Sequence, residues 1–509
     1  MIEVTGRPLE FGDVVAVARG GEPVALGAAA LEAMRQSRDR VDELALGDRP
    51  VYGISTGFGA LAGTLIPPRR RSELQHALIR SHAAGMGEPA DPEVVRGMML
   101  LRLRTLATGR CGVRPAVGEA LAGLLNAGLT PVVPVHGSLG ASGDLAPLAH
   151  VALCLMGEGE VLDAAAGRAP AGAALAAAGL EPLRLQAKEG LSLVNGTDGM
   201  LAMLVLGCTD ARLLLATADV TAAMSVEALL GTDRVFAADL QELRPQPGQA
   251  SSAANLVRLL ADSEIVASHR ESTHAVQDSY SMRCSPQVAG AARDTLDFAV
   301  QVAERELAAA IDNPVVLADG RVESNGNFHG EPLAFACDFL AIAAAEVGSI
   351  AERRMDRLLD PDRSAGLPAF LAEEPGVHSG LMLAQYTAAA LVIENRLLAH
   401  PASTDSVPTS GMQEDHVSMG WTAALKLRRV LANLGRILAV ELVCAARALD
   451  LRAPLRPAAA TEAVRDALRE RVAGVGPDRF LAPELAAAEE LVRMGAVVAA
   501  AERVAGALR

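Results

Sequence analysis

Apolar residues recur every three or four positions along most of the chain, the spacing that buries one face of an α-helix. Leu296, Val300, Ala303 and Leu307, for example, follow one another at intervals of four, three and four residues. The longest such segment runs from about Val417 to Leu451 and would span roughly 50 Å as one continuous helix at 1.5 Å per residue. The pattern predicts a mostly α protein, built as an elongated bundle of long helices with a smaller N-terminal lobe.

Local signals place further elements. A helix is expected from about Gly27 to Glu43, and another from Asp91-Pro92-Glu93 to about Ala107, because a capping acid followed by proline and a second acid favours a helix start. A β-hairpin is expected where Val315-Val316-Leu317 and Arg321-Val322 flank a turn at Ala318-Asp319-Gly320.

The segment from Thr108 to Pro115 contains two glycines and a proline and is the best candidate for a lobe boundary. We place this boundary near residue 110. The N-terminal lobe would then cover 1–110 and include a glycine-rich loop at 51–59, and a helical body would cover 111–509. The body carries the Ala141-Ser142-Gly143 segment discussed below.

Composition narrows the classes of partner. Half of the residues are apolar and only 3% are aromatic, so the core must consist mainly of Ala, Leu and Val, which suits closely packed helices. A net charge of −15 disfavours nucleic acid and anionic membranes and favours a small-molecule substrate. The six cysteines are far apart and form no Cys-x-x-Cys pair, which favours the cytoplasm and disfavours a zinc scaffold. We expect no metal.

The stretch from Gly137 to Asp144 could form a reactive group from its own residues. Its sequence is Gly-Ser-Leu-Gly-Ala-Ser-Gly-Asp. Small residues allow the backbone nitrogen of Gly143 to approach the carbonyl carbon of Ala141. Ring closure and loss of two waters, one of them from the Ser142 side chain, would give a methylidene-imidazolone with an electron-poor exocyclic carbon. Without further information, a simple turn is the ordinary interpretation of such residues.

The fourteen residues from Gly137 to His150 resemble the prosthetic-group segment of the aromatic amino acid ammonia-lyases, and are most similar to the histidine-specific members. Agreeing motifs extend from Tyr52 to Glu414, so the resemblance covers almost the whole chain. It implies that Ala141-Ser142-Gly143 forms 4-methylidene-imidazol-5-one and that no added cofactor is needed. It also implies a homotetramer whose active sites are each built from several chains.

The resemblance assigns roles to residues in the first half of the chain. The loop from Val51 to Gly59 resembles the family's inner lid loop, which supplies a tyrosine, here Tyr52. The pair Ser81-His82 resembles the histidine-specific enzymes, in which the ring contacts the substrate imidazole. Asn195 would lie beside the prosthetic ring and help to hold the substrate carboxylate, a role suited to an uncharged donor.

Further assignments fall between 277 and 328. Arg283 offers a bidentate fork for a carboxylate, and Tyr280, three residues earlier, would share its face of a helix. Gln277 belongs to the same motif and is assigned to substrate binding. Phe328, in the loop Asn325-Gly326-Asn327-Phe328-His329-Gly330, resembles the phenylalanine that packs beside the electrophile.

The run Gln413-Glu414-Asp415-His416 is expected at the start of the long helix, and the histidine-specific lyases show this pattern. Together His82 and Glu414 would hydrogen-bond both nitrogens of an imidazole. The resemblance therefore implies conversion of L-histidine to urocanate and ammonia, the first step of histidine degradation. Tyr280, Tyr52 and Glu414 all remain candidates for the base that removes the β-proton.

Several alternatives are weighed against this function. A histidine 2,3-aminomutase would share the prosthetic group, as would a tyrosine or phenylalanine ammonia-lyase. Fumarase-type lyases need a Met-Pro-x-Lys loop, and a serine hydrolase needs Gly-x-Ser-x-Gly; the chain contains neither at the expected place. Its two lysines, Lys188 and Lys426, lie in no phosphate-binding loop, and no motif supports a pyridoxal Schiff base on Lys188. A catalytically inactive helical scaffold is the non-enzyme alternative.

Overall fold

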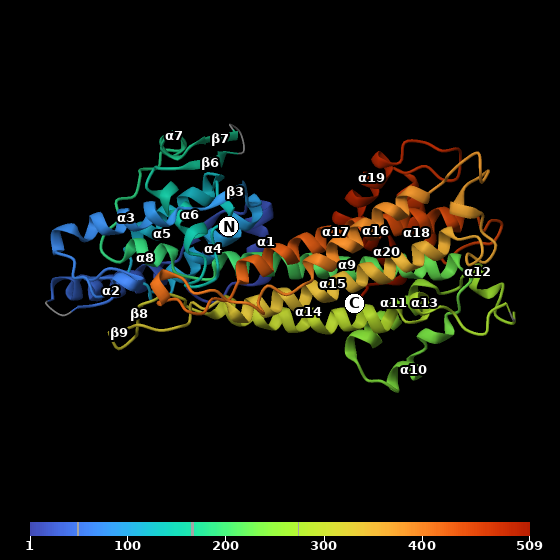
Figure 1. Cartoon of the computed structure of the whole chain (residues 1–509), viewed down its shortest axis with the longest axis horizontal. Helices are drawn as coiled ribbons and strands as arrows, with labels where there is room; N and C mark the ends of the chain where they lie inside the picture. The colour runs from blue at the N-terminus through green and yellow to red at the C-terminus, as the bar shows by residue number, and fades with distance from the viewer. Residues whose placement is uncertain (48–49, 164–166, 273) are drawn as a thin grey trace. The chain divides into compact units, whose positions relative to one another are not determined.

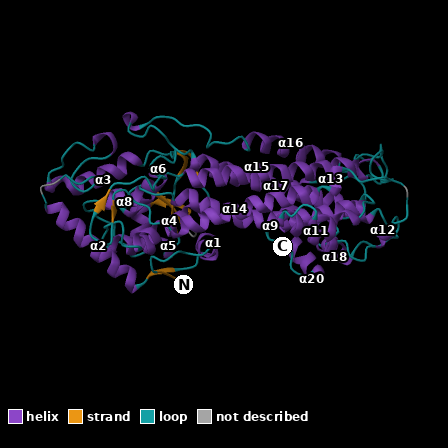
Figure 2. Cartoon of the chain, turned by 90° about the horizontal axis from the view of Figure 1, so that it is seen from below, coloured by secondary structure: helices purple, strands orange, loops and turns teal. Residues whose placement is uncertain are grey.

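The computed structural model describes residues 1–47, 50–163, 167–272 and 274–509. Helices account for 59% of the chain and strands for 7%, and Figure 2 shows how few strands interrupt the helices. The expected mostly α fold with long packed helices is therefore confirmed. The described residues form two compact units. The first contains Met1–Leu206, Val300–Asp338 and Pro401–Leu425, and the second contains Gly207–Ala299, Phe339–His400 and Lys426–Arg509.

Residue 110 lies inside the first unit, so the boundary expected there does not coincide with the boundary between the units. A separate lobe over 1–110 stays a prediction. The helices of this part of the first unit are α1 (Phe11–Gly20), α2 (Ala28–Leu46), α3 (Arg71–His82), α4 (Pro92–Ala107), α5 (Pro115–Asn126), α6 (Leu145–Leu155), α7 (Ala171–Ala177) and α8 (Glu189–Val194). The predicted helices near 27–43 and 91–107 correspond to α2 and α4.

Short strands pair in four small sheets. β1 (Ile2–Val4) pairs in parallel with β2 (Val24–Leu26), and β3 (Met86–Pro89) pairs with β5 (Pro134–His136). The strands β4 (Leu129–Pro131), β6 (Glu160–Asp163) and β7 (Gly167–Pro170) form an antiparallel sheet. The predicted hairpin is confirmed: β8 (Val315–Val316) pairs antiparallel with β9 (Val322–Glu323), and the Leu317 N–H donates to the Arg321 carbonyl across the turn.

Four helices exceed 20 residues: α9 (Asp198–Ala228), α14 (Ser285–Ala308), α15 (Glu331–Leu359) and α17 (Gly420–Asp450). Within the second unit α9, α15 and α17 lie side by side (Figure 1), and a buried ion pair joins them. Glu441 of α17 accepts hydrogen bonds from Thr221 and Ser225 of α9 at 2.7 and 2.9 Å, and it pairs with Arg354 of α15. Removing one partner of such a pair would leave a buried charge, so the network specifies how these helices align.

The shorter helices of the second unit are α10 (Ala238–Glu242), α11 (Pro247–Leu259), α12 (Glu264–Ala267), α13 (Tyr280–Arg283), α16 (Met382–Leu398), α18 (Ala459–Arg469), α19 (Ala482–Arg493) and α20 (Ala496–Ala505). The helices α9 and α15 are long and apolar enough to cross a membrane by length and composition alone. Most of each apolar window is buried inside the structure, 72% for α9 and 56% for α15, which identifies them as core helices.

All six cysteines carry thiols, and five of them are buried. Burial raises the pKa of Cys154, Cys208 and Cys444 to about 12, so these thiols stay protonated and unreactive near neutral pH. They pack as small apolar side chains, as the composition predicted.

Candidate active site

The loop between β5 and α6 contains Ala141-Ser142-Gly143. At two positions of this loop, the backbone conformation requires glycine. Gly140 and Gly143 have positive φ angles of 65° and 74°. A Cβ at Gly143 would overlap the carbonyl oxygen of Gly196, and a Cβ at Gly140 would overlap the hydroxyl of Ser418. The tight approach of Gly143 to Gly196, which also form a β-bridge, therefore depends on the absence of side chains.

Asn195 orients the Ser142 side chain. The Ser142 hydroxyl donates to Asn195 Oδ1 at 2.7 Å, and Asn195 Nδ2 donates to the Asn313 carbonyl at 2.8 Å. Since Asn313 engages the Asn195 amide nitrogen, the amide oxygen faces Ser142. Asn313 was not predicted as a site residue, because its contact with Asn195 joins segments that are far apart in the sequence.

Asp144, the residue after this segment, joins the loop to the start of α9. Its carboxylate accepts the N–H groups of Gly199 and Met200, both at 2.9 Å, and the Ser138 hydroxyl at 3.0 Å. Complete burial raises the pKa of Asp144 to about 7, although all three hydrogen bonds favour the ionised form. The folded protein therefore binds a proton here more tightly than the unfolded chain does.

This difference predicts a pH dependence of stability. Because the pKa of Asp144 is raised on folding, its contribution to stability is present at low pH and is lost as the pH rises through about 7. Between pH 6 and 8 the loss is on the order of 1 kcal/mol per chain. Asp144→Asn removes the ionisable group, and its amide oxygen can still accept the Gly199 and Met200 N–H groups, while its amide nitrogen can donate to the Ser138 hydroxyl and so reverses that bond. Its melting temperature should therefore fall less than that of the wild type over this pH range, as measured by calorimetry.

Asp239→Asn is a matched control, because Asp239 is exposed on α10 and far along the chain from the loop. Its melting temperature should follow that of the wild type. Parallel curves for the wild type and Asp144→Asn would contradict the raised pKa.

Beside the loop lies a cavity of about 660 Å³ in the first unit. Five residues assigned from the sequence line it: Tyr52, Ala141, Ser142, Phe328 and Glu414. The Tyr52 hydroxyl accepts the Gly59 N–H at 3.2 Å, and the Tyr52 ring packs edge-on against Phe58. The cavity wall also contains Asn313, Asp415, His329 and His416, none of which was predicted as a site residue.

His82 ends α3 and is electrostatically linked to Glu414. Partial burial lowers the pKa of His82, and the Glu414 carboxylate opposes this effect. The Ser81 hydroxyl lies 3.1 Å from Nδ1 of His82, while Thr409 donates to Glu414 at 3.1 Å. An uncharged imidazole next to a carboxylate offers both a neutral and an anionic hydrogen-bonding group to a ligand.

The expected position of Glu414 within the long helix is wrong. The helix α17 begins at Gly420, and Gln413–His416 lie in the loop that precedes it. Met419 has a φ of +56°, which stops the helix from extending backwards. The Met419 N–H donates to the Leu139 carbonyl at 2.8 Å, and the Ser418 hydroxyl donates to the Gly140 carbonyl at 3.0 Å. These two bonds hold the Glu414 segment against the Ala-Ser-Gly loop.

Gln277, Tyr280 and Arg283 lie in the second unit and do not line the cavity of the first. All three line a separate depression of about 470 Å³. The Arg283 guanidinium lies 4.8 Å from the centre of the Tyr280 ring, as the expected shared helical face requires. The buried Nε of Arg283 has no hydrogen-bond partner among the described residues, which leaves it available to an anionic ligand.

Lys188 is fully buried and is committed to a structural ion pair. Its Nζ lies 2.6 Å from Asp312 and 2.9 Å from the Ser192 hydroxyl. This pairing opposes a Schiff base on Lys188.

Comparison with known proteins agrees with this geometry. The model of the family described as aromatic amino acid lyase matches residues 9–470. The chain belongs to the aromatic amino acid lyase family. The histidine ammonia-lyase of Streptomyces griseus is 60% identical over 499 residues, which cover 97% of each chain.

Solved structures of the aromatic amino acid lyase family share the fold over nearly the full length. The tyrosine aminomutase of Streptomyces globisporus superposes with a TM-score of 0.94 at 38% identity, covering 100% of both chains. The histidine ammonia-lyase of Trypanosoma cruzi gives a TM-score of 0.91 at 39% identity, covering 99% of this chain and 95% of that chain. A tyrosine aminomutase and a histidine ammonia-lyase thus share the architecture of this chain.

Proposed function

We propose that the protein is a histidine ammonia-lyase, a carbon–nitrogen lyase that converts L-histidine to urocanate and ammonia. The observation that carries the proposal is the 60% identity to a histidine ammonia-lyase over 97% of both chains. The electrostatic interaction of His82 with Glu414 supports the choice of histidine, because a neutral imidazole and a carboxylate suit the two nitrogens of an imidazole.

We further propose that Ala141-Ser142-Gly143 cyclises to 4-methylidene-imidazol-5-one. The Gly143 nitrogen would bond to the Ala141 carbonyl carbon with loss of one water, and the Ser142 side chain would lose the second. The absence of a side chain at Gly143 and the hydrogen bond that orients Ser142 fit such a ring. Once formed, the ring supplies an electrophilic carbon that draws electrons from the bound amino acid and so acidifies its β-proton.

Side chains of the cavity wall would remove the β-proton and exclude water. Tyr52 and Glu414, two of the three candidate bases, both line the cavity, and a positioned base contributes roughly 10²- to 10⁴-fold to the rate. The N–H that Gly59 donates to the Tyr52 hydroxyl at 3.2 Å holds this hydroxyl in place at the cavity wall. Phe328 excludes water beside Ser142, and Asn195 turns its oxygen towards Ser142.

The residues assigned to binding the substrate carboxylate do not line the cavity of the first unit. The cavity of the first unit contains no arginine in its lining, while Arg283 lies in the second unit with Gln277 and Tyr280. We propose that a neighbouring copy in a homotetramer brings these three residues to the site. Light scattering combined with an activity assay at the same concentration should detect an active tetramer, and an active monomer would contradict the shared site.

Product analysis tests the proposed reaction. Incubation with L-histidine should produce urocanate, followed by its ultraviolet absorbance, together with an equal amount of ammonia. The alternative is a histidine 2,3-aminomutase, which the likeness to a tyrosine aminomutase keeps in view. An aminomutase would yield β-histidine on chromatography without stoichiometric ammonia. Tyrosine and phenylalanine serve as comparison substrates, and a faster reaction with either would reject the assignment to histidine.

A further inference from the structure

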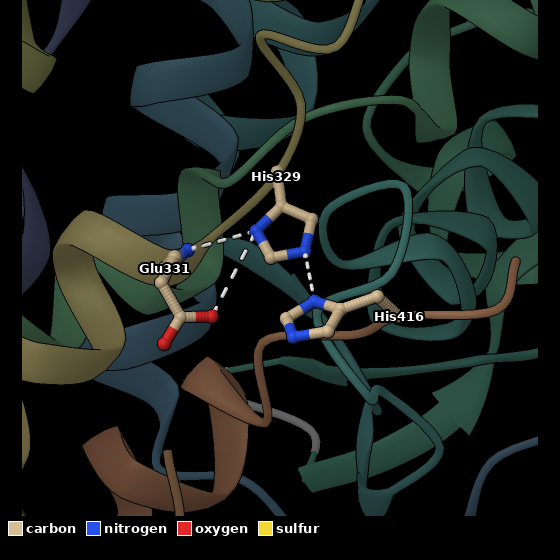
Figure 3. A group of neighbouring side chains, drawn as sticks. All are labelled: His329, Glu331 and His416. Carbon is tan, nitrogen blue, oxygen red and sulfur yellow. Dashed lines mark hydrogen bonds and ion pairs between the residues drawn. The ribbon is translucent and has the colours of Figure 1, made fainter. Parts of the chain in front are cut away.

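His329, Glu331 and His416 form a group of metal-ligating side chains at the wall of the cavity. His329 precedes α15, Glu331 is its first residue, and His416 lies in the turn before α17. Their potential ligand atoms all lie within 4.8 Å of one another, and Figure 3 shows the two rings meeting with Glu331 on the far side of His329. We propose that His329 and His416 bind a divalent transition-metal ion such as Zn²⁺, with Glu331 orienting His329.

The spacing of the ring nitrogens fits two ligands of one ion. Nε2 of His329 and Nδ1 of His416 are 3.3 Å apart. Zinc–nitrogen bonds of about 2.0–2.1 Å in a tetrahedral arrangement place neighbouring ligand atoms about 3.3 Å apart. The two rings therefore need to pivot but not to separate, and an ion would replace the proton that they share in its absence.

Glu331 is placed to support the ion from behind. Its carboxylate lies 3.9 Å from Nδ1 of His329, the nitrogen that points away from His416 (Figure 3). In this structure Nδ1 accepts the Glu331 backbone N–H at 3.4 Å; with a metal on Nε2, the ring proton would move to Nδ1 and would face the Glu331 carboxylate instead. A carboxylate behind a metal-bound histidine fixes the tautomer and the ring orientation and strengthens the ligand.

A second pair of histidines shows what distinguishes this group. His269 and His274 also pack together, with ring centres 5.3 Å apart. Both ring nitrogens of His269 face backbone carbonyls, of Ile265 and Gly231, at 2.8 and 3.1 Å. Nε2 of His274 likewise faces the Leu230 carbonyl at 3.2 Å. These nitrogens face backbone carbonyl oxygens, whereas His329 and His416 direct a nitrogen at each other.

The surroundings favour a cation. Glu414 and Asp415 line the same cavity as the two histidines, and no lysine or arginine occurs in its described lining. The remaining coordination positions are left to water from the cavity. Two imidazoles with an open coordination sphere suit Zn²⁺, Ni²⁺ or Cu²⁺ better than Mg²⁺ or Ca²⁺, which prefer oxygen ligands.

Binding of Zn²⁺ to the full-length protein tests the proposal without any substrate, so its outcome is separate from that of the lyase activity. The protein is stripped with a chelator, dialysed and titrated with ZnCl₂ by calorimetry at one pH. The wild type should bind one Zn²⁺ per chain. His416→Ala should weaken binding by about 100-fold, and Glu331→Gln by about tenfold, since partners behind a metal-bound histidine contribute about 10- to 100-fold.

His274→Ala is the matched control, because it removes a histidine from the other pair and should leave the affinity unchanged. Co²⁺ in place of Zn²⁺ adds a spectroscopic readout, a visible band that should disappear in His416→Ala. Should His416→Ala fail to fold by circular dichroism, His416→Asn replaces it with a polar side chain. Equal affinity in the wild type and His416 variants, or equal loss in His274→Ala, would overturn the proposal.

Discussion

Ser142→Ala should abolish lyase activity and restore two water molecules to the mass of the chain. In the proposed cyclisation Ser142 would supply the carbon of the exocyclic methylidene, and alanine has no hydroxyl to lose. Without the electrophile the β-proton of histidine is too weakly acidic for a side-chain base, so kcat should fall by roughly 10³-fold or more. Intact-mass spectrometry and urocanate absorbance measure the two effects on the same preparation.

Ser251→Ala provides the control, because Ser251 lies on α11 of the second unit, whereas the loop belongs to the first. It should keep both the two-water deficit and the activity. A fully active protein whose mass shows no deficit would reject the prosthetic group altogether. An equal deficit in the wild type and Ser142→Ala would show that the missing waters come from elsewhere in the chain.

Substitutions of His82 and Arg283 should impair the recognition of different parts of the substrate. His82→Leu removes a polar contact that only an imidazole uses, so activity on histidine should fall about 10- to 100-fold more than activity on tyrosine or phenylalanine. Arg283→Lys keeps the positive charge but loses the planar fork for the carboxylate. Arg283→Lys should lower the activity on all three amino acids by a similar factor, again about 10- to 100-fold.

Steady-state kinetics with the three amino acids decide this assignment. Glu414→Gln completes the set, because it keeps the shape of the side chain and removes its charge. A lower kcat with little change in KM would assign Glu414 to proton transfer or to stabilising the transition state, whereas a higher KM alone would assign it to binding the ring. If His82→Leu reduced all three activities in equal proportion, the selectivity role of His82 would be wrong.

Features that depend on neighbouring residues could be predicted from the sequence alone. Helical spacing and a favourable start predicted α2 and α4, and a turn between two β-branched runs predicted the hairpin of β8 and β9. The three-residue spacing of Tyr280 and Arg283 placed the guanidinium on the tyrosine ring. These features depend on backbone geometry within a few residues, so the spacing of residue types in one sequence is enough to predict them.

Which distant segments meet could be seen only in the folded chain. Bonds to the loop of Leu139 and Gly140 set the position of Glu414, and α17 begins later than its apolar spacing suggested. The pairing of Asn195 with Asn313, and of His329 with His416 across 87 residues of sequence, has no local signal. Periodicity reports which face of a segment is buried but not what is packed against it, so such contacts arise only when the whole chain is folded.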